Sequence, residues 1–254
     1  MNGQGLCSVT FRALPAREVL SLAAAAGLSC IEWGGDVHAP PSLGADALRA
    51  LGDATRAAGL AVSSYGSYHR LGASDPAELP AVLAAAKALG APVVRVWAGA
   101  KGAAESSAGE RAAVHAATRA AAALAAREGL ALSFECHPGT LTDDPEETLS
   151  LLREGPPEAL GTHWQPNQYR DEAWNLACAA ALAPRVRAVH VFAWSPGAAG
   201  KAVRHGLAEH APLWRRRFAA LPASAPRLLE FLPGDDPALL PREAAALASL
   251  SNPR

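Results

Sequence analysis

The sequence predicts a single-domain α/β protein, a (β/α)8 barrel of the TIM type that comprises residues 1–254. Eight short runs rich in β-branched and aromatic residues alternate with long stretches of alanine and leucine, in which charged residues recur at helical spacing. No linker of proline, serine or like charges divides the chain, and 254 residues suffice for one such barrel. No G-x-G-x-x-G motif follows the first strand, which disfavours an open sheet that binds a dinucleotide.

The elements follow one another as repeated strand and helix units. Helical stretches include residues 15–27, 46–59, 77–90 and 109–129, and several of them end in the glycine that closes a helix in a left-handed conformation. The candidate strands are residues 6–11, 30–35, 60–67, 92–99, 130–137, 160–167, 186–194 and 226–234.

The amino-acid composition limits the kinds of partner that we expect the protein to bind. The 23 lysines and arginines nearly balance the 24 aspartates and glutamates, so we expect no nucleic acid and no membrane, but a small neutral or anionic solute. The cysteines Cys7, Cys30, Cys136 and Cys178 form no C-x-x-C pair, and no basic region precedes a cleavable apolar stretch. We therefore predict a cytoplasmic protein with reduced thiols, and leave a homodimeric assembly open.

Polar side chains gather near the strand ends, where a barrel of this type carries its active site. Every strand after the first contributes at least one. These residues are Glu32, Asp36, His38, Tyr65, Ser67, His69, Arg95, Trp97, Glu135, His137, His163, Gln165, Asn167, His190, Trp194 and Glu230.

The stretch "SFECHPGTLTDD", residues 133–144, places a carboxylate, a thiol and an imidazole side by side. Residues two apart on a strand share a face, so Ser133, Glu135 and His137 are expected to point into the barrel while Phe134 and Cys136 face the helices. Cys136 is then a small buried hydrophobe, and its neighbours carry the chemistry.

Two glutamates, one histidine and one amide come from four successive strands, the fifth to the eighth, and converge on one end of the barrel. Taken singly, such a carboxylate is often half of a buried ion pair, for which Arg95 or Lys101 could be the partner, and a lone histidine is often a satisfied core residue. Their convergence favours a metal site. Oxygen and imidazole ligands without thiolates suit one divalent ion: Mg²⁺, Mn²⁺, Co²⁺ or Zn²⁺.

The motifs "GLSCIEWGGDVHAP", "FECHPGTLTDD", "HWQPN", "VHVF" and "LLEFLPGDD" resemble those of the xylose-isomerase-like TIM barrels, the sugar phosphate isomerase/epimerase superfamily. This superfamily includes ketose 3-epimerases, hydroxypyruvate isomerase, inosose dehydratase and endonuclease IV. The resemblance extends from the second strand to the eighth.

The resemblance implies that Glu135, His190 and Glu230 bind the metal, with Gln165 at a position where relatives have aspartate. The first coordination shell would then carry two negative charges instead of three. We expect weaker metal retention and a stronger pull on an enolate oxygen. The extra substrate-binding histidine and arginine of the ketose 3-epimerases have no counterpart in "QPNQ" and "HVFAWSP", which argues against ketohexose epimerase activity.

By resemblance, the function is that of a metal-dependent isomerase or epimerase acting on a sugar-like α-hydroxy carbonyl compound through an enediolate, with Glu135 and Glu230 as the acid/base pair. Alternatives are a dehydratase or lyase acting on a keto-sugar or keto-cyclitol, and a sugar-binding barrel without catalysis, for which Gln165 is suggestive. An endonuclease IV-like nuclease is disfavoured by the balanced charge. The predicted substrate-binding residues are His137, Trp97, Tyr65, Glu32, His38, Arg95 and Trp194, although Glu32 could instead only pair with Arg95.

Two basic segments have simpler interpretations. "LWRRRF", residues 213–218, is expected to be the solvated face of a helix, because three adjacent arginines spread around it. "AGKAVRHG", after the seventh strand, is loop-like, and Lys201, Arg204 or His205 could form a lid over the barrel mouth.

Overall fold

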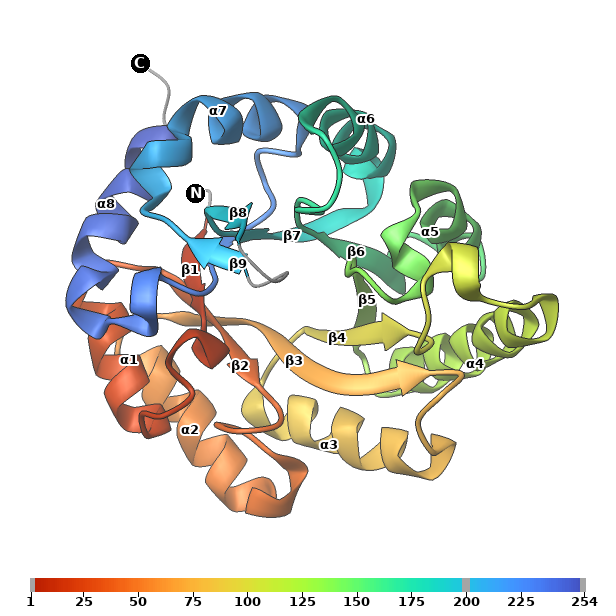
Figure 1. Cartoon of the computed structure of the whole chain (residues 1–254). Coiled ribbons are helices and arrows are strands. Elements are labelled where there is room, and N and C mark those ends of the chain that lie inside the picture. The colour runs from red at the N-terminus through yellow and green to blue at the C-terminus, as the bar shows by residue number, and fades with distance from the viewer. Residues whose placement is uncertain (1–2, 198–201, 252–254) are drawn as a thin grey trace.

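Eight parallel strands close into a barrel, and helices surround it (Figure 1). The computed structural model describes residues 3–197 and 202–251. Around the barrel the strands follow the order β1, β2, β3, β4, β5, β6, β7, β10, and β10 pairs with β1. Their bounds are Gln4–Cys7, Cys30–Gly34, Ala61–Leu71, Val93–Ala98, Ala131–Glu135, Leu160–Trp164, Val186–Val191 and Arg227–Leu229. The predicted fold class is confirmed.

The helices alternate with the strands. Three of the predicted helix stops are glycines in the left-handed region, Gly59, Gly90 and Gly129, with φ of 81°, 81° and 72°. Each is followed at once by the next strand, as the sequence predicts. The helices are α1 (Ala16–Ala25), α2 (Ala45–Ala57), α3 (Leu79–Leu89), α4 (Ala108–Arg127), α5 (Pro145–Leu152), α6 (Glu172–Leu182), α7 (Ala211–Ala220) and α8 (Leu240–Ser251).

The first strand is shorter than predicted and begins earlier. Residues 8–11 form a 3-10 helix instead of continuing the strand predicted over 6–11. Two of its hydroxyl groups accept hydrogen bonds from neighbouring segments of the barrel. Ser8 Oγ accepts from the backbone N–H of Gly34 at 2.8 Å, and Thr10 Oγ1 accepts from the backbone N–H of Phe231 at 3.0 Å. The β-branched and aromatic residues of this segment are therefore buried, as in a strand, although the backbone turns.

A two-stranded antiparallel hairpin, β8 (Trp194–Pro196) and β9 (Ala202–Arg204), follows β7. The predicted strand over residues 186–194 ends at Val191, before this hairpin. Arg204 forms an ion pair with Asp235 at 2.5 Å and lies 4.6 Å from the Phe231 ring centre, and His205 Nε2 lies 2.6 Å from Ser195 Oγ. Lys201 lies outside the described residues.

The largest fully buried side chains of the core are three indole rings. Trp33, Trp164 and Trp214 are fully buried, and the last two meet edge to face at 6.4 Å. Burial of one large apolar side chain contributes roughly 1.5–3 kcal/mol. Trp33 Nε1–H donates to Thr55 Oγ1 at 3.1 Å, so its polar group is also satisfied. All four cysteines are buried and unpaired. No helix among the described residues is both long and apolar enough to cross a bilayer.

Gly66 in β3 marks where backbone and buried charges approach closely. A Cβ atom at this position would lie 2.9 Å from Glu32 Oε1 and 3.0 Å from Arg95 Nη2. Gly109 in α4 is a contrasting position, since nothing lies within 4 Å of a Cβ added there.

We predict that Gly66→Ala lowers the free energy of unfolding by about 1–3 kcal/mol, because the added methyl group forces the ion pair to shift. Gly109→Ala is the control, for which we expect no change or a gain of up to about 1 kcal/mol. Urea unfolding followed by circular dichroism measures both. Equal effects of the two substitutions would contradict the close packing described here.

Candidate active site

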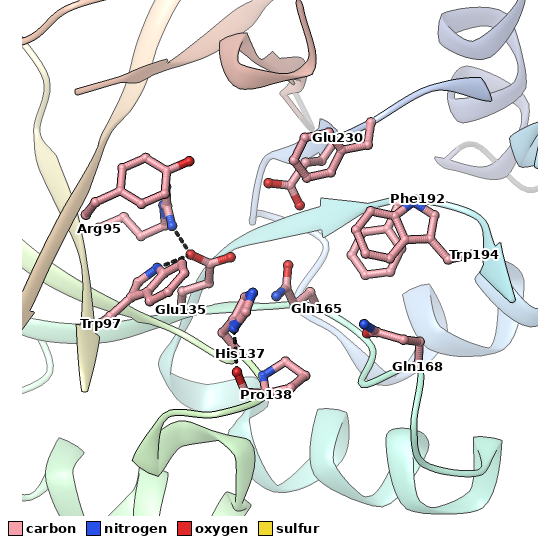
Figure 2. A pocket seen from close by; sticks show the side chains of 12 residues that line it. Arg95, Trp97, Glu135, His137, Pro138, Gln165, Gln168, Phe192, Trp194 and Glu230 are labelled. Carbon is pink, nitrogen blue, oxygen red and sulfur yellow. Dashed lines mark hydrogen bonds and ion pairs between the residues drawn. The ribbon is translucent and has the colours of Figure 1, made fainter. Parts of the chain in front are cut away.

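A cavity of about 180 Å³ opens at the carboxyl end of the barrel (Figure 2). Phe192 and Trp194 face Glu135 and Trp97 across it. The lining side chains that the sequence predicts are Arg95, Trp97, Glu135, His137, Gln165, Trp194 and Glu230.

His190, one of the four predicted metal ligands, is fully buried in β7. The other three lie around one of its ring nitrogens. Its Nδ1 lies 3.3 Å from Oε1 of Gln165, 3.5 Å from Oε2 of Glu230 and 3.7 Å from Oε1 of Glu135. Three oxygen atoms from three different strand ends therefore converge on one imidazole nitrogen.

Glu135 ends β5 and is held through one of its oxygens. The indole N–H of Trp97 donates to Oε2 at 2.5 Å, and the guanidinium group of Arg95 forms an ion pair with the same oxygen. Both donors lie on β4, two residues apart, so they share the inward face of that strand. The other oxygen, Oε1, is the one that faces His190. Lys101, the other partner considered for a buried carboxylate, instead pairs with Glu110 on the surface.

Glu32 lies below the cavity and does not line it. Its carboxylate accepts from Arg95 Nε at 3.1 Å, from Ser64 Oγ at 2.6 Å and from His163 Nε2 at 3.1 Å. Of the two predicted roles, wall residue or partner of Arg95, the structure therefore shows the pairing. Arg95 contacts both Glu32 and Glu135, and so connects the floor of the barrel to its mouth.

The charge states of this floor follow from its contacts. Burial alone would raise the pKa of Glu32, but the charges of Arg95 and His190 and the hydrogen bond from His163 hold it well below its usual value. Burial lowers the pKa of His163, so this imidazole is neutral at neutral pH. Its Nε2 then donates to Glu32, since a carboxylate can only accept, and its Nδ1 accepts from Ser133 Oγ at 2.6 Å.

The pKa of His190 is shifted in the opposite direction to that of His163. Burial alone would lower its pKa, but the negative charges of Glu230 and Glu32 raise it well above the usual histidine value. Its second nitrogen, Nε2, is buried without a hydrogen bond and lies 3.5 Å from Glu32 Oε1. The site therefore favours positive charge at or beside this ring.

His137 projects into the cavity between Glu135 and Gln165 (Figure 2). Its Nδ1–H donates to the carbonyl oxygen of Pro138 at 2.7 Å, which leaves Nε2 as an acceptor. The ring stacks on Trp97 with centres 4.5 Å apart. Because burial lowers the pKa of His137, the imidazole is neutral at neutral pH and can accept a hydrogen bond or a proton.

Tyr65, predicted to shape the pocket, lies outside it. Its ring is fully buried, and its hydroxyl donates to the carbonyl oxygen of Ala39 at 2.9 Å. Tyr68 lines the cavity instead. Ser64 and Gly66 lie against Glu32 inside the barrel, and Tyr68 shares their side of β3 whereas Tyr65 points outward. The register of β3 shifts against both neighbouring strands, so the sequence pattern does not reveal this placement.

His38, predicted to line the opposite wall, is also placed elsewhere. Its ring nitrogens lie 2.9 Å from Ser8 Oγ and 3.0 Å from the carbonyl oxygen of Leu14, so it joins β2 to the first loop. Phe192 and Phe231, which sequence reasoning missed, line the cavity. Phe192 follows from alternation with His190, whereas Phe231 takes a left-handed φ of 54° that no strand pattern reveals.

Two groups of three potential metal-binding residues occur within the described residues. One is Cys7, His190 and Glu230, and the other is Glu32, His163 and His190. Burial raises the pKa of Cys7 to about 12, which disfavours it as an anionic ligand. In the second group, Glu32 is already paired with Arg95 and His163, which leaves only His190 without a hydrogen bond at Nε2 to any described residue. Both groups contain His190 and the first contains Glu230, whereas Glu135 belongs to neither.

A family model described as xylose isomerase-like TIM barrel matches residues 20–218. The chain belongs to this family. The family resemblance predicted from the sequence is thereby confirmed. No curated protein matches the sequence.

Solved structures share the whole fold. The probable 3-DHS dehydratase AsbF of Bacillus anthracis, involved in petrobactin synthesis, superposes with a TM-score of 0.81 at 20% identity, covering 99% of this chain and 100% of the other. D-allulose 3-epimerase from Methylomonas sp. gives 0.73 at 19% identity, covering 98% of each. A xylose isomerase-like protein from Mycobacterium smegmatis, in complex with magnesium, gives 0.69 at 14%, covering 98% and 96%. At these identities the similarity establishes the fold.

We predict that Arg95→Met costs about 3–5 kcal/mol of the free energy of unfolding, since it leaves two buried carboxylates without their cation. Adding Glu32→Gln should recover part of this loss. The control is Arg119→Met, which removes a largely exposed ion pair with Glu154 and should cost at most about 1 kcal/mol. Urea unfolding tests the series, and an unchanged stability of Arg95→Met would contradict the network.

Proposed function

We propose that the barrel mouth binds one divalent cation through Glu135, Gln165, His190 and Glu230, and that the protein is a sugar isomerase or epimerase. The observation that carries this proposal is the convergence of three oxygen atoms on Nδ1 of His190. Two carboxylates, an amide oxygen and an imidazole form a donor set that suits Mg²⁺, Mn²⁺, Co²⁺ or Zn²⁺. The partner is a small sugar-like molecule.

The charges around the site support a cation. Arg95 and His163 already satisfy Glu32, so the negative charge that remains at the mouth belongs to Glu135 and Glu230. Nε2 of His190 faces Glu32 at 3.5 Å, a second contact of the kind that orients metal-binding histidines. When bound, a divalent cation would polarise a substrate carbonyl and stabilise the negative charge that develops on its oxygen.

The side chains around this site have distinct tasks in proton transfer. Glu230 lines the cavity on the side of β10 and is the candidate general base that removes the proton next to the carbonyl. Glu135, fixed by Trp97 and Arg95 on the opposite side, would act as the acid in its protonated form, and afterwards Glu230 would release its proton to solvent while Glu135 takes one up. His137 Nε2 accepts a hydrogen bond from a substrate hydroxyl, and the enediolate forms between these groups.

One observation favours a dehydratase or lyase as the second candidate. Phe192, Trp194 and Phe231 form an apolar wall, with ring centres 4.4 Å apart for the first pair and 5.5 Å for the second. A ketose chain with a hydroxyl on each carbon would lose hydrogen bonds against this wall, whereas a keto-cyclitol can place a C–H face on it. Elimination begins with the same proton abstraction.

The cytoplasmic location and the homodimer stay predictions from the sequence.

We expect the purified protein to take up about one divalent ion per chain, and Glu135→Gln and Glu230→Gln to lose it. Gln165→Asp should retain the ion more tightly, because it adds a third negative charge. Metal content by mass spectrometry after dialysis measures this, with exposed Glu18→Gln as the control. If wild type binds no metal and only Gln165→Asp binds it, the isomerase proposal is overturned, and a sugar-binding barrel remains.

We further expect the metal-loaded protein to exchange the proton next to the carbonyl of its keto substrate with solvent deuterium. Nuclear magnetic resonance on a panel of ketoses and keto-cyclitols detects this exchange. Glu230→Gln should lower the exchange rate by at least about 100-fold, because it removes the general base and, as a metal ligand, also weakens the hold on the ion. Exchange without loss of water identifies an isomerase or epimerase, and exchange coupled to an unsaturated product identifies a dehydratase. Full exchange by Glu230→Gln would contradict its role.

A further inference from the structure

A second cavity of about 190 Å³ lies beside the first, between the loop that connects β6 to α6 and the helix α7. The two cavities share Gln168, Phe192 and Trp194, which stand at one end of the site in Figure 2. Each cavity alone is smaller than the roughly 300 Å³ at which ligand pockets usually begin, whereas the two together exceed it. The two cavities therefore adjoin at these three side chains.

Arg217, which lines this second cavity, is buried, whereas the sequence predicts that it is exposed to solvent. The sequence assigns all three arginines of "LWRRRF" to a solvated face, but Arg217 is only 7% exposed, while Arg215 and Arg216 are exposed. Its Nε and Nη2 donate to Glu172 at 3.2 Å and 2.6 Å, and its guanidinium carbon lies 5.0 Å from the Trp214 ring centre. Within the described residues its Nη1 has no hydrogen-bond acceptor, so this nitrogen is what Arg217 offers a ligand.

The other free groups of the cavity are also donors or can act as donors. Oδ1 of Asn167 accepts from the backbone N–H of Tyr169 at 3.0 Å, which leaves its amide nitrogen available. Arg170 presents an exposed guanidinium group at the rim, and Gln168 an amide.

The carboxylate that could repel an anion is already occupied, because Glu172 is the partner of Arg217. His210, the remaining titratable group of the lining, has its pKa lowered by burial and by the charges of His205 and Arg217, so it is neutral. A carboxylate or phosphate oxygen matches this set of donors in charge and in hydrogen bonding.

We propose that the second cavity binds the anionic end, carboxylate or phosphate, of a substrate whose carbonyl lies at the barrel mouth. The inference rests on the proposed function for the reacting end and adds the substrate class: an acidic or phosphorylated sugar-like α-hydroxy carbonyl compound. Its chain passes Gln168 and the Phe192–Trp194 wall, with the distal charge on Arg217 and Arg170.

The test compares three probes that differ only at the distal carbon: D-fructose, D-fructuronate and D-fructose 6-phosphate. Calorimetry on the metal-loaded full chain should show one charged probe binding at least about tenfold more tightly than D-fructose, which is 1.4 kcal/mol. The preferred probe distinguishes carboxylate from phosphate. Equal affinities for all three would overturn the proposal.

Variants assign this preference to the cavity. Arg217→Gln combined with Glu172→Gln removes the cation without leaving its partner unpaired, and Arg170→Gln alters only the rim. Both should reduce the preference for the charged probe over D-fructose, the double variant to less than about twofold. Arg216→Gln, an equal charge change on the exposed side of α7, should keep the full preference. An equal loss in Arg216→Gln would indicate a general field effect and overturn the assignment.

Inorganic phosphate separates this inference from the proposed function, because its binding requires neither metal nor carbonyl chemistry. If phosphate binds wild type and is lost in the double variant while no metal is taken up, the anion site stands and the isomerase proposal fails. If metal binds, but phosphate does not bind and the charged probes bind no more tightly than D-fructose, the isomerase proposal stands and the anion site fails.

Discussion

A buried guanidinium group between two buried carboxylates is the constraint on which the site depends. Arg95 pairs with Glu32 on the floor of the barrel and with Glu135 at its mouth, and both its partners are almost fully buried. Ions in such a place are stable only when each is paired and hydrogen-bonded. Ser64, His163 and Trp97 supply those hydrogen bonds, and Gly66 leaves the room that the pair needs. Glu135 is thus fixed by Arg95 and Trp97, which also line the cavity, while Glu32, Ser64 and His163 complete the network below it.

This arrangement also determines what the mouth can bind. Because Arg95 is committed to Glu32 as well as Glu135, it offsets only part of the negative charge of Glu135 and Glu230. Gln165 adds an oxygen without a charge, where relatives are expected to have a third carboxylate. The residual charge suits a divalent cation held less tightly and therefore more polarising toward a bound carbonyl oxygen.

The fold, and the convergence of Glu135, Gln165 and Glu230 on His190, could be predicted because they depend on period and order. Alternation correctly paired Glu135 with His137 on one face and sent Cys136 into the core. The same rule did not place Tyr68 in the cavity, because β3 runs past the predicted residues 60–67 and its register shifts against both neighbouring strands. Other features depend on tertiary contacts that no local pattern records: the 3-10 turn at residues 8–11, the left-handed Phe231, and the burial of Arg217 against Glu172, a residue 45 positions away.

The most direct test of the central claim is a crystal structure of the protein soaked with Mn²⁺, with the ion located by its anomalous scattering. The proposal predicts a single peak within bonding distance of Glu135, Gln165, His190 Nδ1 and Glu230, with the Arg95–Glu32 pair undisturbed. A peak on the other side of the ring, among Glu32, His163 and His190 Nε2, or no peak at the mouth while the four side chains remain in place, would contradict it.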